Sequence, residues 1–197
     1  MATNGHICVL KTPTTYTYLG IDPGTEQSGF TALYPGGPKH TGVFQNAELL
    51  NHCERVLIEC DQKGLGVRVG IEMIACYGMP VGREVFETCL WIGKFVARFP
   101  RVSGHVEIRK VYRREVKHHL CNSVKANDAN IRRALIDLYP PTGGGAVPQI
   151  GTKSKPGPLY GFKSHAWAAL GVAKTAEANW HILEPFLQSQ PTTTASL

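Results

Sequence analysis

Residues 18–30 read YLGIDPGTEQSGF, and this pattern sets the architecture of the rest of the chain. An apolar run of strand-forming residues ends at Asp22, and the turn at Pro23 and Gly24 sends the chain back into a second strand. A carboxylate that ends a strand and precedes a tight glycine turn is open to a cation. Asp22 is therefore the first candidate metal ligand; the simpler alternative is an Asp that only forms the turn.

A second acid follows the same rule further along the chain. Residues 67–73 read VRVGIEM, a strand pattern that ends with Glu72. Between the two strands, residues 46–63 carry apolar side chains at three- and four-residue intervals and predict a helix. A strand–helix–strand crossover makes the two strands parallel, so Asp22 and Glu72 are expected side by side. Two adjacent strand-end acids indicate a divalent-metal site, although an exposed Glu at a strand end is the simpler alternative for Glu72.

The remaining periodicities complete a mixed α/β pattern. Strands are predicted at 16–22, 28–34, 40–44, 67–73 and 106–111, and helices at 46–63, 83–99, 128–139 and 165–182. The order predicts a five-stranded mixed sheet flanked by helices, an α/β fold of the ribonuclease H-like arrangement. One domain over residues 16–184 is expected, with a flexible lead at 1–15 and a disordered tail at 185–197. The Gly- and Pro-rich loop at 140–163 suggests function or disorder.

Composition is that of an ordinary globular domain, with 197 residues, 43% hydrophobic and 18% charged. No apolar run approaches the ~20 residues that span a bilayer, and the N-terminus lacks a signal-peptide pattern, so no membrane partner is expected. Six cysteines form no CxxC pair and sit mostly in apolar patterns. They are interpreted as reduced core thiols of a cytoplasmic protein.

The charge distribution points to nucleic acid. The net charge is +6, and residues 109–133 hold eight of the 21 Lys and Arg against only Glu115 and Asp128. Two acids are too few to offset the mutual repulsion of these basic side chains. A phosphate backbone is therefore the expected partner, in preference to a basic face that is covered only by water. The eight basic residues are Arg109, Lys110, Arg113, Arg114, Lys117, Lys125, Arg132 and Arg133.

Four segments together resemble a known family. They are LGIDPGT at 19–25, the strand end at 71–72, RREVK at 113–117 and AALGVA at 168–173. In spacing and residue type they are similar to the RuvC family of Holliday-junction resolvases, over residues 18–178, and the spacing elsewhere is similar to phage-encoded members. The resemblance implies a homodimeric crossover junction endodeoxyribonuclease that nicks branched DNA with bound Mg²⁺, for which Mn²⁺ substitutes, in recombination, repair or phage genome processing.

The resemblance also implies roles in the site. Asp22 would bridge two metal ions, and Glu72 would ligate one and orient water. The family's other ligands lie one turn apart at the start of the last helix; His165 takes the first position, as a ligand or general acid/base, unless it stacks on Trp167 instead. Ala168 takes the second and cannot bind metal. Asp128 could replace it, or could simply stabilise the start of its own helix.

The remaining expectations concern DNA contacts. Lys117, His118, His119 and Lys125 are expected to contact phosphate near the site, and Lys117 could also stabilise charge on the cleaved phosphate. In the loop after Glu72, Tyr77 is the counterpart of an aromatic wedge, unless it folds onto its own protein, and Met79 lies beside it. The other predicted DNA-binding residues are Arg109, Lys110, Arg113, Arg114, Lys153 and Lys155.

Three alternatives stay open. The first is a catalytically weak or inactive junction-binding protein, because of Ala168. The second is a nuclease directed at RNA on the same scaffold. The third is a sugar kinase or ATPase, since DPGT resembles the phosphate loop of actin-like proteins, but that fold needs two such domains. For a nuclease, paired nicks need paired sites, and the broadly apolar helix at 83–99, which a second layer or a second subunit should cover, is the candidate dimer surface.

Overall fold

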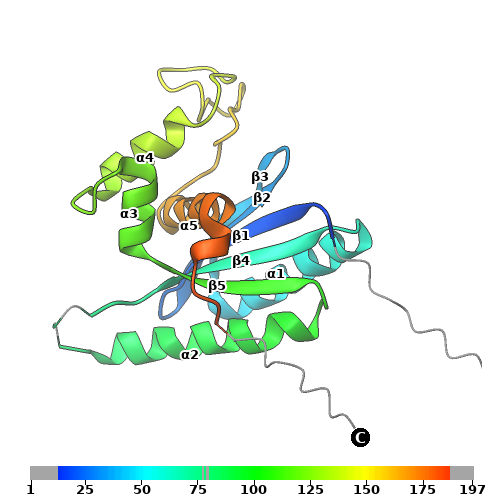
Figure 1. Cartoon of the computed structure of the whole chain (residues 1–197). Coiled ribbons are helices and arrows are strands. Elements are labelled where there is room, and N and C mark those ends of the chain that lie inside the picture. The colour runs from blue at the N-terminus through cyan, green and yellow to red at the C-terminus, as the bar shows by residue number, and fades with distance from the viewer. Residues whose placement is uncertain (1–12, 77, 79, 187–197) are drawn as a thin grey trace, which may run out of the picture.

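The computed structural model describes residues 13–76, 78 and 80–186. Five strands form one mixed sheet in the order β3-β2-β1-β4-β5 (Figure 1). β1 pairs antiparallel with β2 and parallel with β4, and β4 pairs parallel with β5. The predicted mixed five-stranded sheet is confirmed. Its strands are β1 (Tyr16–Asp22), β2 (Gln27–Tyr34), β3 (Gly37–Gln45), β4 (Gly66–Met73) and β5 (Val106–Tyr112).

Helices cover both faces of this sheet (Figure 1). One face packs against α1 and α2, whose buried side chains form a core with the strands. The other face packs against α5, which carries a second core shared with α3 and α4. The helices are α1 (Asn46–Gln62), α2 (Arg83–Arg98) with the short η1 (Phe99–Arg101), α3 (Arg113–Cys121), α4 (Asp128–Asp137), and α5 (His165–Asn179) with η2 (Trp180–Ile182).

The alternation of side chains along β1 decides which way Asp22 faces. Leu19 and Ile21 are fully buried in the core on the α1 side. Gly20 faces α5 so closely that a Cβ there would lie 2.0 Å from the carbonyl oxygen of Ala169. Since alternate residues of a strand share a face, Asp22 lies on the same side as Gly20, toward α5.

Strand β4 repeats the arrangement. A Cβ on Gly70 would lie 3.1 Å from Cγ1 of Val172 on α5, whereas Ile71 is fully buried in the opposite core. Glu72, two residues after Gly70, therefore also faces α5. Small residues at these positions let the helix lie low on the sheet, with its start above the ends of β1 and β4.

Helix α3 was not predicted from the sequence. It follows β5 without a loop, and the backbone N–H of its N-cap residue, Tyr112, donates to the carboxylate of Glu115 at 2.6 Å. This Glu, three residues after the N-cap, is half of a capping box. The density of basic side chains hid it, because the run was read only as a charged segment.

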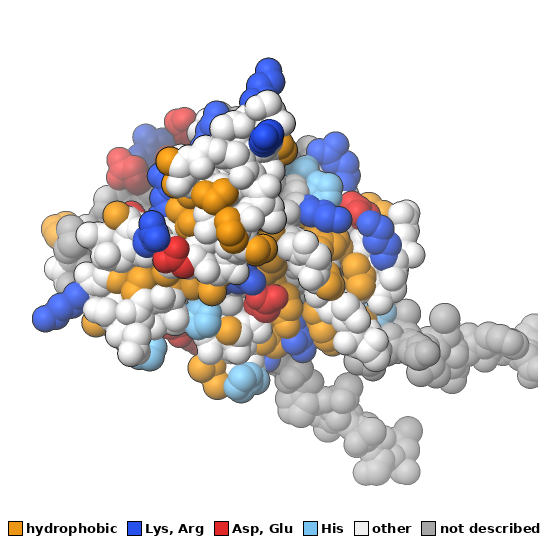
Figure 2. Space-filling view, turned by 90° about the horizontal axis from the view of Figure 1, so that it is seen from above, with side chains coloured by type: hydrophobic (Ala, Val, Ile, Leu, Met, Phe, Trp, Pro, Cys, Tyr) orange, Lys and Arg blue, Asp and Glu red, His pale blue; other side chains and the backbone are white. Residues whose placement is uncertain are grey.

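The loop at 140–163 has a defined fold of its own. Backbone hydrogen bonds join Gly143 to Pro148 at 2.7 Å, Gly144 to Lys155 at 3.0 Å and Leu159 to Gln149 at 2.8 Å. This internal bonding shows an ordered loop rather than a disordered one. In Figure 2, which looks down on the lobe formed by α4 and this loop, Lys and Arg side chains project from it on several sides.

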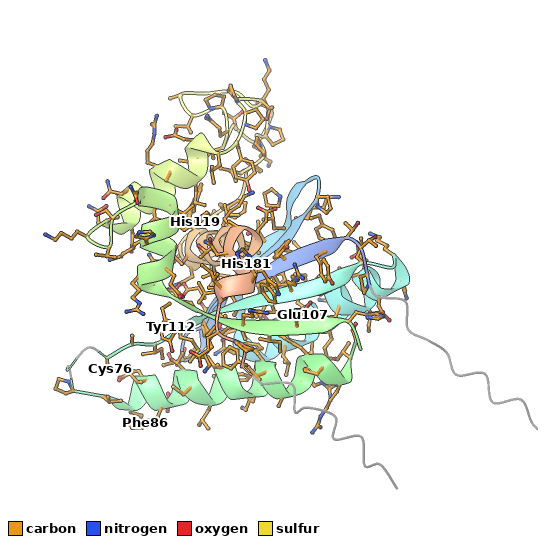
Figure 3. All side chains as sticks on the ribbon, viewed as in Figure 1. Cys76, Phe86, Glu107, Tyr112, His119 and His181 are labelled. Carbon is orange, nitrogen blue, oxygen red and sulfur yellow. The ribbon has the colours of Figure 1, made fainter. Side chains whose placement is uncertain are left out.

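Helix α2 is buried on one side only. Thr88, Ile92 and Phe95 face the core, but Phe86 and Leu90 remain 63% and 66% exposed. Figure 3 shows Phe86 on the side of α2 turned away from the sheet. No second layer of the described chain covers this face.

The cysteine prediction holds only in part. Cys53 and Cys60 are fully buried, but Cys89 is exposed on α2, and Cys76 and Cys121 are half-buried. These five described cysteines are all free thiols. Cys89 was misjudged because it follows the apolar stripe of α2, and that stripe faces outward.

The segment that follows η2 pairs with β5. Pro185 forms an antiparallel bridge with Arg109, and the Phe186 N–H donates to the Ile108 carbonyl at 3.2 Å, so the segment after η2 lies along β5. The first two residues of the tail expected at 185–197 therefore lie along β5, whereas the rest of that tail, from 187 onward, and the part of the lead up to 12 lie outside the described residues. Among the residues that are described, no helix combines the length and apolarity needed to cross a membrane.

Candidate active site

Asp22 and Glu72 lie side by side at the carboxyl ends of β1 and β4. The parallel register pairs Ile21 with Ile71, which puts the two acids at the next step. Their side chains are only 17% and 13% exposed. This is the arrangement expected from the sequence.

The electrostatics of the pair reflect this crowding. Burial and the nearby Asp22 carboxylate raise the pKa of Glu72 to about 7. Burial also raises the pKa of Asp22, although a hydrogen bond from His165 opposes the effect. Desolvated carboxyl groups with raised pKa values are more frequent at functional sites than elsewhere, which makes this pair a candidate site.

His165, the first residue of α5, lies against Asp22. Its Nδ1 is 2.8 Å from Oδ2 of Asp22. When Asp22 is ionised its carboxylate only accepts, so Nδ1 of His165 is then the donor. Trp167 packs instead against Phe162, with ring centroids 5.3 Å apart and the planes tilted by 47°, so the alternative of His165 stacked on Trp167 is not what the structure shows.

An open hollow of about 490 Å³ surrounds these groups. Asp128, at the first position of α4, reaches its rim with an 84% exposed side chain. Arg113, directly after β5, pairs with Asp128 through Nη2 and lies 3.6 Å from Oε2 of Glu72 through Nη1. The hollow is lined by Asp22, Glu72, Arg113, Asp128, Ile131, Arg132, Ser164, His165, Trp167 and Ala168.

The donors fit a divalent cation in kind. Oε2 of Glu72 is buried and has no hydrogen-bond partner within the described residues, and a carboxylate oxygen of this kind is a suitable ligand for a divalent cation. The donors are nevertheless not gathered around one point, since the described residues contain no cluster of three or more His, Cys, Asp or Glu side chains arranged to hold an ion. Asp22 is engaged by His165, and Glu72 by Arg113.

Ala168 lies on the wall of this hollow, one turn along α5 from His165. Ala168, where the sequence resemblance expects a second acid, therefore offers no ligand to the hollow. Lys117 lies one turn after Arg113 on α3 and is half-buried, and its charge opposes the upward shift of the Glu72 pKa. Lys117 is thus within electrostatic reach of the acids without lining the hollow.

The other predicted DNA contacts are spread over the surface. Arg114, Lys125, Lys153 and Lys155 are exposed. His118 and His119 are exposed too, and they line a separate hollow with the end of α5 and η2 rather than the hollow around the acids.

Two basic residues on β5 are engaged within the protein. Nη1 of Arg109 donates to the carbonyl of Leu183 at 2.7 Å, and Lys110 pairs with Glu184. Both are half-buried and do not line the hollow around the acids. Tyr77 and Met79, the predicted wedge, lie outside the described residues.

The place of Arg113 was missed by sequence reasoning, which assigned it to the DNA arms. The signal was present: Arg113 follows a third parallel strand at the edge of the sheet where Asp22 and Glu72 lie. Arg132 was also missed as a lining residue; its guanidinium carbon lies 4.8 Å from the ring centre of Trp167.

Comparisons with known proteins identify the fold. No family model and no curated protein matches the sequence. Among solved structures, RuvC from Thermus thermophilus matches with a TM-score of 0.60 at 18% identity, covering 86% of this chain and 99% of that one. T. thermophilus RuvC in complex with a Holliday junction substrate matches with a TM-score of 0.57 at 17% identity, with the same coverage. The fold of this chain is therefore that of RuvC, the mixed α/β arrangement of the ribonuclease H type.

Proposed function

We propose that this protein is a metal-dependent endonuclease that nicks Holliday junctions and other branched DNA. The observation that carries the proposal is the adjacent, buried pair of Asp22 and Glu72, with His165 2.8 Å from the first. A strand-end pair of carboxylates on this fold is suited to phosphodiester hydrolysis. A solved structure of the same fold holds a Holliday junction, which supports branched DNA as the substrate class.

In this proposal Asp22, Glu72 and His165 hold the divalent ion, with Asp128 as the residue that makes up for Ala168. Mg²⁺, or Mn²⁺ in its place, would supply Lewis-acid activation of water and of the phosphate oxygen. His165 donates through Nδ1 to Asp22 and fixes its orientation. Lys117, one turn along α3 from Arg113, stabilises the negative charge that grows on the phosphate.

DNA arms would lie across the exposed basic side chains. Arg114 and Lys125 come from α3 and the turn after it, and Lys153 and Lys155 come from the folded loop. These contacts position the backbone without reading sequence. Lys117→Ala is expected to weaken junction binding and to make its salt dependence shallower by about one charge; an unchanged slope removes Lys117 from the interface.

Two active sites would be supplied by a homodimer. The exposed face of α2, with Phe86 and Leu90, is the surface that a second copy would cover. A two-fold dimer suits a four-way junction, because paired nicks in opposite strands need paired sites.

The test is nicking of a labelled four-way junction by the Asp22→Asn variant, with Mg²⁺ or Mn²⁺. We expect nicking to fall at least about 100-fold, since the variant loses a metal ligand, while junction affinity changes by less than about threefold. Asp61→Asn is the matched control: Asp61 is on α1, where it accepts from Ser103, far from the hollow. Wild-type nicking by Asp22→Asn contradicts the assignment.

Because Ala168 cannot bind metal, a second candidate function remains, which is binding of junctions without cleavage. Tight binding with no nicking under either metal favours that function. Flap, duplex and RNA–DNA hybrid substrates in the same assay separate a branched-DNA nuclease from one directed at RNA. Preference for the four-way junction over the hybrid is the expected result.

A further inference from the structure

Arg113 occupies a particular place between two acids. Its side chain is 28% exposed, its Nη2 pairs with Asp128, and its Nη1 lies 3.6 Å from the buried Oε2 of Glu72. That distance allows charge attraction but is too long for a hydrogen bond. Both Nη1 and Oε2 are buried and have no hydrogen-bond partner among the described residues. The contact between Arg113 and Glu72 is therefore an ion pair without a hydrogen bond, and the fold sets its distance.

The same oxygen is the one that a cation would need. A carboxylate oxygen binds Mg²⁺ or Ca²⁺ at about 2.0–2.6 Å, and a divalent ion on Oε2 would stand beside the guanidinium. Two such cations repel each other by several kcal/mol even at the effective dielectric constant of a protein surface, about 20. Arg113 and a divalent ion thus compete for Glu72.

Competition with a divalent ion for Glu72 is not a general property of basic residues in the hollow, as Arg132 shows. It lines the same space, but its guanidinium lies over the ring of Trp167 at 4.8 Å. No ion pair joins it to an acid among the described residues. Arg132 therefore provides a matched charge at the same site that does not engage Glu72.

We propose that Arg113 is an internal counter-ion that a divalent cation displaces from Glu72, and that a DNA phosphate accepts the released guanidinium. The proposal rests on the proposed function and deepens it, because it couples metal binding to DNA binding at one residue. Arg113 can leave, since its other partner, Asp128, is 84% exposed. A phosphate offers the guanidinium a bidentate partner of at least equal quality.

The coupling has a defined sign. DNA that takes up Arg113 frees Glu72 for the metal, and metal on Glu72 frees Arg113 for DNA, so each ligand strengthens the other by the same factor. Without DNA, metal binding is weakened by the energy needed to displace Arg113.

The experiment measures two affinities of the full-length protein separately. Calorimetric titration with Mn²⁺ in the absence of DNA is carried out on wild type and on Arg113→Gln. Loss of the competing charge is expected to tighten Mn²⁺ binding by about tenfold or more. Fluorescence anisotropy with a labelled junction in EDTA is then expected to show weaker binding by Arg113→Gln, by about fivefold. A merely structural role would not move the two affinities in opposite directions.

Controls separate the possible outcomes. Arg132→Gln removes the same charge from the same hollow and is expected to leave Mn²⁺ affinity within about twofold. Arg113→Lys keeps a cation but loses the fork that reaches both acids, so an intermediate gain of about threefold is expected, and this variant decides the question if Arg113→Gln does not fold. Unchanged or weaker Mn²⁺ binding in the decisive variant, or an equal gain in Arg132→Gln, overturns the inference.

These results are distinguishable from a failure of the proposed function. Wild type that binds Mn²⁺ and responds to Arg113→Gln, but nicks no DNA, contradicts the nuclease and leaves the competition standing. Wild type that nicks junctions but shows no response of Mn²⁺ affinity to Arg113→Gln contradicts the competition alone.

Discussion

The imidazole of His165 lies 2.8 Å from the carboxylate of Asp22, across 143 positions of sequence. The contact joins the first residue of α5 to the last residue of β1. Ser164, just before it, has a φ of 41°, a left-handed conformation uncommon for a residue other than glycine. The start of α5 is thus set so that a ring nitrogen meets the central acid.

Replacing this imidazole is expected to impair both metal binding and turnover. His165→Ala removes the hydrogen bond that orients Asp22 and a possible ligand, so Mn²⁺ affinity should fall by about 10–100-fold and nicking by at least about 100-fold. Calorimetry and the junction assay measure the two effects. His181→Ala, an exposed histidine on η2, is the control; equal loss in both variants contradicts a specific role for His165.

Restoring the missing acid is expected to strengthen the site. Ala168 lines the hollow and is only partly buried, so Ala168→Asp places a carboxylate one turn from His165. We expect Mg²⁺ affinity to rise by about fivefold or more, because hard cations favour carboxylate oxygen. Ala178→Asp, at the exposed far end of α5, should change nothing. A weaker Mg²⁺ affinity in Ala168→Asp would show that the ligand has been replaced from elsewhere.

Stability of the metal-free protein should fall as pH rises. The pKa of Glu72 is about 7 in the folded protein against an ordinary value of 4.5. The folded state therefore binds the extra proton between these values, and the stability this gives is present below pH 4.5 and lost as pH rises through 7. Glu72→Gln should raise Tm in EDTA by about 2–4 °C at pH 8 but not at pH 4.5. Equal Tm shifts at both pH values would exclude this linkage.

The close approach of β2 to α5 can be tested at a glycine. A Cβ on Gly29, which pairs with Asp22, would lie 2.2 Å from the carbonyl oxygen of His165. Gly29→Ala is expected to cost about 1–3 kcal/mol of unfolding free energy and to weaken Mn²⁺ binding, because His165 must move. Gly36→Ala, where a Cβ meets nothing within 4 Å, should stay within about 0.5 kcal/mol by denaturant unfolding.

The exposed face of α2 predicts the oligomeric state. Leu90→Glu places a charge on a side chain that is 66% exposed in the monomer, so folding should be unaffected while a dimer through this face is disrupted. Light scattering should report a dimer for wild type and a monomer for Leu90→Glu. Ile58→Glu on α1, 46% exposed, should leave the dimer intact. Monomeric wild type at assay concentration would rule out this surface.

The local sequence pattern was enough to predict the two strands that carry Asp22 and Glu72. The runs that end at Asp22 and Glu72 have the period and length of buried strands, and the crossover rule made them parallel. His165 was found as well, from a resemblance at the start of the last helix. The positions of these residues follow from the local sequence pattern and from the crossover rule, which is why the sequence was enough to indicate them.

The other features of the site and surface depend on contacts between residues that are far apart in the sequence, so they could be found only in the three-dimensional structure. Arg113 was read as one of many basic residues, because nothing in a linear sequence shows that its guanidinium lies between Glu72 and Asp128. Helix α2 was expected to be covered on two sides, and the apolar stripe that it leaves exposed became evident only with the packing of the chain.

The sequence by itself determined the order of the strands and of every helix except α3, the adjacency of two strand-end acids, and the absence of an acid at Ala168, since these follow from side-chain period, the crossover rule and residue type. Only the tertiary structure decided which charges meet. Electrostatic pairing depends on distances of a few ångströms between segments far apart in the chain, and the packing of α3, α4 and α5 over the sheet sets those distances.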